Sequence, residues 1–291
     1  MIGSIFVAYA LIAMWLFRRQ KAKRRVVPPE EFVLLRWPGE SLSKSVEALL
    51  DEVMNTLLYG TVVSLGLMLI PVVVTLAFPK TELLTLLLCS MTLLAVSAAV
   101  IVNRVIKLLD SRAKKKLGYL GERHVAEELQ KVTGLGYAIF HDIPMTLNGY
   151  EQNIDHVAVG PMGLVVIETK ARSKPNEETG TKAKVTFDGQ RLIWPRFADD
   201  RATVMQVARC AQWMSRQVKE VCGYDVPVQQ IIAIPGWEVV PGKCHNPRVV
   251  SGRRVSQTLM FFHEEKPTSL NKRQIEKITQ MLDGLCRDVN E

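Results

Sequence analysis

Residues 153–170 read NIDHVAVGPMGLVVIETK, and this stretch decides the fold of the C-terminal part of the chain. Two runs rich in β-branched residues flank the four residues GPMG at 160–163. Proline suits the second position of a tight turn, and glycine suits the fourth. We therefore predict an antiparallel β-hairpin whose two-residue loop is Pro161-Met162.

The turn fixes the register of the hairpin by symmetry. The apolar pairs nearest the turn are Val159 with Leu164 and Val157 with Val166. At the open end, Asp155 is opposite Glu168, and Lys170 shares a face with Glu168. Opposed side chains have Cβ atoms roughly 4.5–5.5 Å apart, so two carboxylates at these positions repel each other.

A divalent cation between Asp155 and Glu168 would resolve this repulsion. Carboxylate oxygens are the ligands that Mg²⁺ and Mn²⁺ prefer. The alternative is an ion pair between Lys170 and one of the acids, with the other acid at the surface. The apolar pattern on both faces of the hairpin favours the metal interpretation.

Residues 118–132, GYLGERHVAEELQKV, predict a helix with an acid on its apolar stripe. Glu122 shares a face with Val125, Ala126 and Leu129, which follow it by three, four and seven residues. A buried carboxylate needs a cation or a metal nearby. The alternative is that Glu122 lies at the start of its helix, where the helix dipole favours an acid.

The ordered set of Glu122, Asp155 and Glu168-Thr169-Lys170 resembles the core of the PD-(D/E)xK nucleases. More closely, GERHVAEEL, IDHVAVGPMGLVVIETK and a later Gln206 in a helix resemble NERD, the nuclease-related domain, over roughly residues 118–282. One departure is Asn153, where we expect Gln or Glu two residues before the aspartate.

The resemblance implies a metal site and a reaction. Asp155 and Glu168 would hold Mg²⁺ or Mn²⁺, helped by the carbonyl of Thr169 and by Glu122 directly or through water. Lys170 would position the attacking water or stabilise the transition state. The catalytic residues expected are therefore Glu122, Asp155, Glu168 and Lys170.

The rest of the C-terminal part completes an α/β pattern. A polar loop at 173–184 is followed by a strand-like piece at 191–195, a helix at 203–221, a buried strand at 226–234 and an amphipathic helix at 270–286. With the earlier helix and hairpin, the order αβββαβ is typical of a mixed sheet with flanking helices. On the 203–221 helix, Gln206 and Arg209 lie beside the apolar face and could reach a phosphate; a solvated flank is the alternative.

The first third of the chain predicts three transmembrane helices, at 1–17, 56–78 and 83–102. Basic residues follow the first run at 18–25 and the third run at 104–116. Positive charge marks the cytoplasmic side, so both flanks predict an outside N-terminus and a cytoplasmic C-terminal domain. We expect the membrane to be the bacterial inner membrane.

The expected domains follow from these segments. A basic and amphipathic linker would occupy 18–55, a helical hairpin 56–102, a basic juxtamembrane linker 103–117 and a NERD-like domain 118–291. The predicted spans carry no charged residue, which disfavours a channel or transporter. The helices would anchor the protein or assemble with protein partners.

Charge and cysteine content limit the remaining function classes. The net charge of +8 indicates a polyanionic partner, either nucleic acid or anionic lipid. Five cysteines without a CxxC pair indicate neither a disulfide framework nor a zinc ribbon. Cys244-His245 could contribute to a metal site, although scattered reduced thiols are the better interpretation.

Two main function hypotheses remain, beside a third in which the protein is a subunit of a membrane complex and acts mainly through helix packing. The first is a membrane-tethered, Mg²⁺-dependent nuclease whose expected substrate is DNA. The second is a non-catalytic membrane adaptor that binds nucleic acid or a protein partner through the same fold. The acid constellation favours the nuclease, because an adaptor has no need to keep four such residues together.

Overall fold

The computed structural model describes residues 34–78, 82–147, 149–174, 183–240, 246–265 and 269–287, with residues 12, 15, 16 and 19 near the N-terminus. The chain divides into two compact units. One consists of Met1–Phe32 and Ser45–Ala113, and the other of Val33–Lys44 and Lys114–Glu291.

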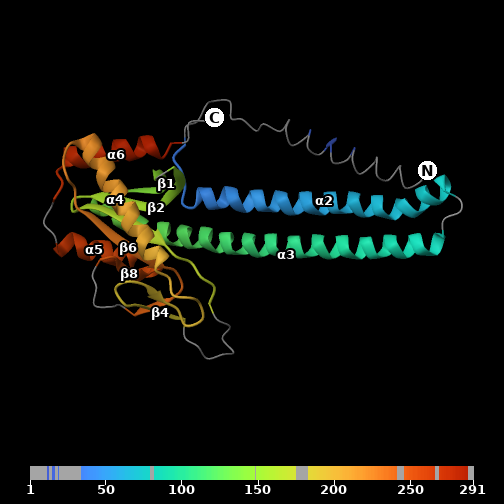
Figure 1. Cartoon of the computed structure of the whole chain (residues 1–291). Helices are drawn as coiled ribbons and strands as arrows, with labels where there is room; N and C mark the ends of the chain where they lie inside the picture. The colour runs from blue at the N-terminus through green and yellow to red at the C-terminus, as the bar shows by residue number, and fades with distance from the viewer. Residues whose placement is uncertain are drawn as a thin grey trace. The chain divides into compact units, whose positions relative to one another are not determined.

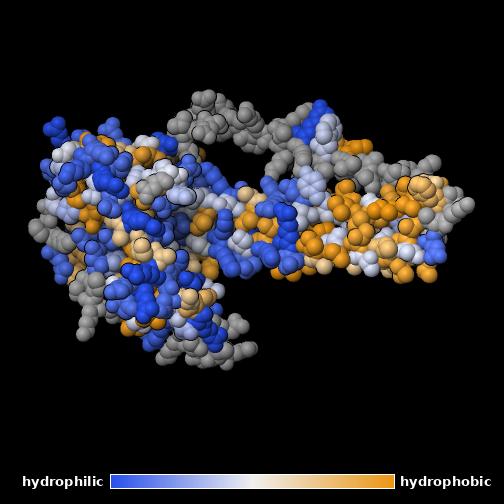
Figure 2. Space-filling model, viewed as in Figure 1, coloured by the Kyte–Doolittle hydropathy of each residue, from blue (hydrophilic) through white to orange (hydrophobic). Residues whose placement is uncertain are grey.

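The first unit is built from two long helices, α2 (Glu40–Ala77) and α3 (Leu83–Leu129), whose ends nearest the sheet belong to the second unit. By length and composition both could cross a membrane. Only 11% of the apolar window of α2 and 0% of that of α3 is buried within the molecule, so neither resembles the core helix of a soluble protein. Figure 2 shows the resulting hydrophobic surface. The first predicted span, at 1–17, and the basic run at 18–25 lie largely outside the described residues.

The helices are longer than the segments we predicted from the sequence. The expected boundaries at residues 55 and 103 fall inside α2 and α3, so both linkers next to the helical hairpin are helical where they meet it. The short segment Val33–Lys44 belongs to the second unit and not to the first. Within this segment, Arg36 and Ser41 contact Asp142 of the second unit.

The second unit contains a five-stranded mixed sheet (Figure 1). Its strands are β1 (Ala138–Leu147), β2 (Tyr150–Gly160), β3 (Gly163–Thr169), β6 (Val228–Ile234) and β8 (Arg248–Ser251), in the order β1-β2-β3-β6-β8. The first three strands pair antiparallel, and β6 and β8 add in parallel.

The predicted hairpin is confirmed as β2 and β3. Gly160 pairs with Gly163, so Pro161-Met162 is the loop. The apolar pairs are those expected from the turn: Val159 with Leu164 and Val157 with Val166. Gly163 has a φ of 119°, and a Cβ there would lie 2.7 Å from the carbonyl oxygen of Pro227, so only glycine fits this position.

The order αβββαβ is present, but its third strand is not the one we predicted. The sheet gains β1, which precedes the hairpin and was not expected. The strand-like piece at 191–195 is β5 (Leu192–Ile193), which belongs to a separate small sheet with β4 (Lys184–Phe187) and β7 (Glu238–Val240). Periodicity cannot assign a short strand to a sheet.

Helices cover both faces of the main sheet. On one face, α4 (Ala202–Cys222) and α6 (Lys272–Leu285) pack against Val157, Val159, Leu164 and Val166 of the sheet. On the other face, the end of α3, the 3-10 helix η1 (Gln130–Leu135) and α5 (Val255–Glu265) pack against Ala158, Val165 and Ile167. A second 3-10 helix, η3 (Gly252–Arg254), leads into α5. The alternation of strand side chains thus buries both faces, and the predicted mixed sheet with flanking helices is observed.

Candidate active site

The acids predicted from the hairpin lie at its open end. The strand pairs extend to His156 and Ile167, so Asp155 and Glu168 are the next residues along the two strands. Asp155 Oδ2 accepts a 2.6 Å hydrogen bond from the backbone N–H of Thr169. This bond ties the side chain of Asp155 to the strand that carries Glu168.

Glu122 reaches the same end of the sheet from α3. Its neighbour Gly121 packs so closely that a Cβ there would lie 2.8 Å from Cβ of Ala171 and 3.6 Å from Cγ2 of Thr169. The absence of a side chain at Gly121 lets the helix approach the end of β3. Glu122, the acid predicted on the helix before the hairpin, therefore lies close to β3.

Burial and mutual repulsion raise the pKa values of all three acids. Burial, followed by the charges of Asp155 and Asp142, raises the pKa of Glu122 to about 9. Burial also raises the pKa of Asp155 to about 7, although the N–H of Thr169 opposes the shift. The pKa of Glu168 is raised well above its ordinary value by burial and by Asp155. The three acids therefore act on one another electrostatically.

Two carboxylate oxygens in this cluster are buried without a hydrogen-bond partner: Oε2 of Glu122 and Oε2 of Glu168. The two residues are only 6% and 5% exposed. An unpartnered buried oxygen costs free energy, which either a proton or a bound cation would offset.

Lys170 lies beside the acids, and its ion pair is with another residue. Its Nζ is 3.7 Å from Oδ2 of Asp200, which also accepts a 3.1 Å bond from Arg172 Nη2. Asp200 is held in turn by the N–H and hydroxyl of Thr203, at 3.0 and 2.9 Å, at the start of α4. The alternative ion pair of Lys170 with Asp155 or Glu168 is not the one observed.

A fourth acid, Asp142 of β1, was missed by the sequence analysis. The pairs His141–His156 and Ile143–Ile154 place it opposite Asp155 in register. It has a φ of 51° and is 2% exposed. Strand β1 was not predicted, so the position of its acid next to Asp155 could not be inferred from the sequence.

Both carboxylate oxygens of Asp142 accept hydrogen bonds, unlike Oε2 of Glu122 and Oε2 of Glu168. It accepts from the N–H and hydroxyl of Ser41, at 3.2 and 2.6 Å, and from the amide of Asn153 at 3.1 Å. Arg36 Nη1 lies 3.5 Å from its Oδ2. Asn153, the departure from the family pattern, therefore supports Asp142, and Asp142 fastens the segment before α2 to the sheet.

Residues 117–235 match the family model of NERD, the nuclease-related domain. The match begins before Glu122 and ends after β6, so it contains every candidate site residue predicted from the sequence. No curated protein and no solved structure matches the chain. The match supports the NERD resemblance and a nuclease-like function, while β8, α5 and α6 lie beyond the matched residues.

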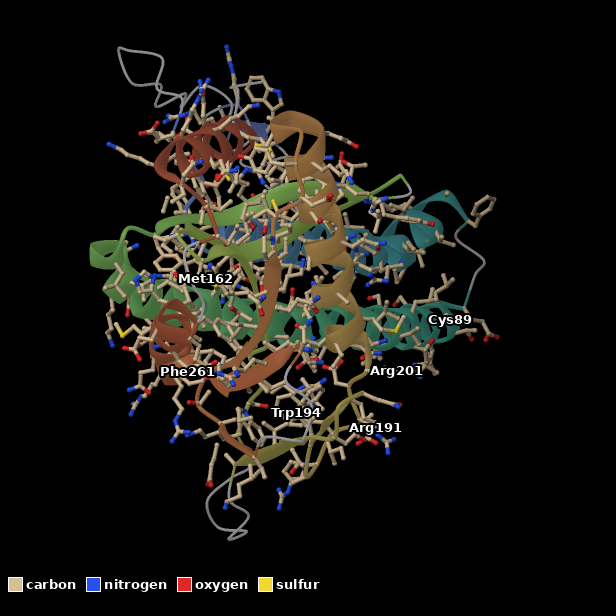
Figure 3. The ribbon with its side chains drawn as sticks, turned by 90° about the vertical axis from the view of Figure 1, so that its left-hand side faces the viewer. Cys89, Met162, Arg191, Trp194, Arg201 and Phe261 are labelled. Carbon is tan, nitrogen blue, oxygen red and sulfur yellow. The ribbon has the colours of Figure 1, made fainter. Side chains whose placement is uncertain are left out.

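Gln206 and Arg209, the two residues predicted to reach a phosphate, differ in exposure. Gln206 is partly buried on α4, four residues before Cys210. The charges of Glu168 and Asp155 help burial to raise the pKa of the Cys210 thiol to about 12, so this face of α4 lies near the acids. Arg209 and Arg216 are exposed on α4, and the exposed Arg201 directly precedes the helix, where Figure 3 labels it.

The donor atoms of the acid cluster fit a divalent cation in their chemistry. The acids are oxygen donors, and two of their oxygens lack a protein partner. Among the residues that the structure describes, however, no three His, Cys, Asp or Glu side chains are arranged so that they could hold a metal ion. The side chains would therefore need to adjust to bind a cation. Cys244 and His245 lie outside the described residues.

Proposed function

We propose that this chain is a membrane-anchored, metal-dependent nuclease that hydrolyses phosphodiester bonds of nucleic acid. The expected substrate is DNA, and the NERD domain would face the cytoplasm of a bacterial cell. The observation that carries the proposal is the gathering of Glu122, Asp155 and Glu168 at one end of the hairpin, with raised pKa values and unpartnered oxygens, inside the NERD match.

Each residue of the site has a distinct proposed role. Asp155 and Glu168 would hold Mg²⁺ or Mn²⁺ together with the carbonyl of Thr169, and Glu122 would assist directly or through water. A divalent cation bound there supplies a water of lowered pKa and offsets negative charge on the phosphate. The carboxylates must lose their protons to bind it, which their raised pKa values oppose until the cation is present.

Lys170 would act on the reaction itself. Its ammonium group lies beside acids that would bind the cation, and Asp200 restrains it from one side. A fixed positive charge can orient the attacking water or stabilise the charge that develops on the phosphate. Gln206 on the neighbouring face of α4 would contact the substrate.

Positive charge supports nucleic acid as the partner. The chain carries a net charge of +8. Arg209 and Arg216 are exposed on α4, two helical turns apart, and the exposed Arg201 directly precedes the helix. Such a basic face binds a phosphate backbone without sequence preference, and its binding weakens as salt concentration rises.

The two apolar helices α2 and α3 support the membrane anchor. Their apolar side chains are exposed, and the basic residues of α3 at 104–116 follow its apolar run. We propose that this positive flank lies in the cytoplasm, as the sequence predicted. The exposed helical faces would contact lipid or the helices of partner proteins.

The second candidate is the non-catalytic adaptor, and one observation favours it. Within the described residues, the acids do not converge on a point where three of them could hold a metal. A fold that kept its acids protonated would need no cation. The adaptor would retain the anchor and the basic face of α4.

The test is a nuclease assay on the full-length chain in detergent, with and without Mg²⁺. The full chain is required because residues 34–44 belong to the same compact unit as the NERD domain. Cleavage that needs Mg²⁺ and disappears in Asp155→Asn supports the nuclease. A well-folded wild type that binds nucleic acid but never cleaves it supports the adaptor.

A further inference from the structure

An open hollow of about 360 Å³ lies on the surface of the C-terminal unit. It is lined by Trp37, Pro38, Tyr119 and Arg123. Trp37 is 53% exposed, and the guanidinium of Arg123 lies over the ring of Tyr119 at 5.8 Å. Two aromatic rings and a cation thus surround a space that is accessible from solvent.

The hollow adjoins the acid cluster. A Cβ built on Gly39 would lie 2.8 Å from Cδ2 of Tyr119 and 3.3 Å from Oε2 of Glu122. Gly39 therefore touches both a wall of the hollow and an acid of the site. Glu122 and Arg123 are also consecutive residues of α3.

The tryptophan is exposed, but its backbone is fixed. Trp37 to Glu40 form a tight turn in which Pro38 takes the second position and Gly39, with a φ of 71°, takes the third. The N–H of Glu40 donates to the carbonyl of Trp37, and the N–H of Trp37 donates to Oε2 of Glu40, each at 3.2 Å. On the side before the turn, the N–H of Arg36 donates to the carbonyl of Cys286 at 2.9 Å.

An exposed indole on a fixed backbone is suited to stacking. It presents a large flat surface without the entropy loss of ordering a mobile loop. Stacking of a base on an aromatic ring contributes roughly 1–3 kcal/mol by alanine substitution and tolerates any base. Arg123 adds a positive charge for the adjoining phosphate; its only ion pair among the described residues, to Glu127 at 4.0 Å, is long and exposed.

We propose that this hollow is a subsite that stacks one unpaired nucleobase on Trp37 next to the reacting phosphodiester. A base inside a duplex has both faces covered by its neighbours, so the subsite would select single strands or frayed ends. This inference rests on the proposed function, because it assigns the class of nucleic acid that the same site takes.

Binding, measured apart from cleavage, tests the subsite. Fluorescence anisotropy of a labelled single-stranded oligonucleotide and of a blunt duplex of the same sequence would be followed in EDTA at low salt, with the full-length chain in detergent. The variants are Trp37→Ala, Trp37→Phe and the control Tyr150→Ala. Tyr150 is a suitable control because it is 77% exposed at the start of β2, outside the hollow.

We expect Trp37→Ala to weaken single-strand binding by roughly 5- to 150-fold, the range of one lost stacking interaction. Duplex binding should stay within about 2-fold of wild type, and Trp37→Phe and Tyr150→Ala should bind the single strand nearly as wild type does. Unchanged single-strand binding in Trp37→Ala, or equal losses for both oligonucleotides, would overturn the subsite.

A parallel cleavage assay in Mg²⁺ separates this inference from the proposed function. If wild type binds the single strand through Trp37 but never cleaves it, the subsite stands and the nuclease fails. If wild type cleaves, and Trp37→Ala binds and cleaves the single strand as well as wild type does, the nuclease stands and the subsite is overturned.

Discussion

The hydroxyl of Ser41 donates a 2.6 Å hydrogen bond to Oδ1 of Asp142, across 101 residues of sequence. The bond joins the start of α2 to strand β1, and Asp142 lies opposite Asp155 in register. A residue in the first turn of α2 thus contacts an acid one strand away from the proposed metal ligands.

Removing this hydroxyl should destabilise the C-terminal unit. A hydrogen bond to a charged group contributes roughly 1.5–3 kcal/mol, and the N–H of Ser41 still donates to Asp142 in the variant, so we expect Ser41→Ala to cost about 1–2 kcal/mol. Thermal unfolding of the full-length chain would show the loss. The control is Ser43→Ala, two residues along the same helix; equal melting temperatures for the two variants would show that the bond is unimportant.

Glu122 should make the metal-free protein less stable as pH rises. Its folded pKa of about 9 lies above its ordinary value of 4.5, so its contribution to stability is complete below about pH 4.5 and is lost as pH rises towards 9. Between pH 7 and 9 we expect the melting temperature in EDTA to fall, and Mn²⁺ to restore more stability at pH 9 than at pH 7.

That window avoids the buried histidines. Burial lowers the pKa of His141 to about 4, so this residue affects stability only below about pH 6.5. Glu168, whose pKa is also raised, contributes to the same decline, so Glu122→Gln should make the decline between pH 7 and 9 shallower without abolishing it. Glu127→Gln, which changes an exposed acid on the same helix, should leave the decline as it is in wild type. A decline of equal slope in both variants would mean that Glu122 is not the group responsible.

Asp200 should matter to turnover through Lys170. Asp200→Asn keeps an oxygen for the N–H of Thr203 but loses the charge that restrains Lys170 and Arg172. Since misplacing a reacting group by about 1 Å can cost 100-fold, we expect cleavage to fall roughly 10- to 100-fold while Mn²⁺ affinity stays unchanged.

The neighbouring acid provides the control for Asp200. Asp199→Asn removes an exposed ion pair with Arg191, 2.8 Å long, and should leave cleavage at the wild-type rate. A matching loss of Mn²⁺ affinity in Asp200→Asn would show that Asp200 acts on the metal site instead of on Lys170.

The topology of the membrane part can be tested on intact cells. In a chain without its native cysteines, a membrane-impermeant thiol reagent should label a cysteine at Glu82, between α2 and α3, and spare one placed after Asn290. The basic flank at 104–116 gives this orientation. Labelling after Asn290 in unbroken cells would reverse the assignment.

The hairpin could be predicted from the sequence because its information is local. Gly160 and Gly163 frame the turn, and a two-residue loop leaves one register for Val157, Val159 and their partners. The approach of Glu122 was anticipated from an acid on an apolar stripe. Helix α4 and strand β6 followed from periodicity and were found where expected.

The long-range contacts could not be predicted. Nothing local to Trp37 or Ser41 indicates that the segment Val33–Lys44 packs on a sheet about one hundred residues later. Asp142 was missed with its strand, and the sequence analysis did not single out Asp200, which pairs with Lys170. Such contacts depend on tertiary packing, which single-sequence patterns do not encode.

The central claim is that the acids bind one metal and that Lys170 acts in the reaction. Asp155→Asn and Glu168→Gln keep shape and remove charge, whereas Lys170→Ala removes the ammonium group. The measurement that tests the claim most directly is Mn²⁺ affinity and DNA cleavage on these three variants beside wild type, with thermal unfolding to confirm that each is folded. We expect both acid variants to lose metal binding and cleavage together, and Lys170→Ala to bind Mn²⁺ normally while cleavage falls roughly 100-fold or more. Wild-type cleavage that persists in Asp155→Asn, or a folded wild type that neither binds Mn²⁺ nor cleaves DNA, would contradict it.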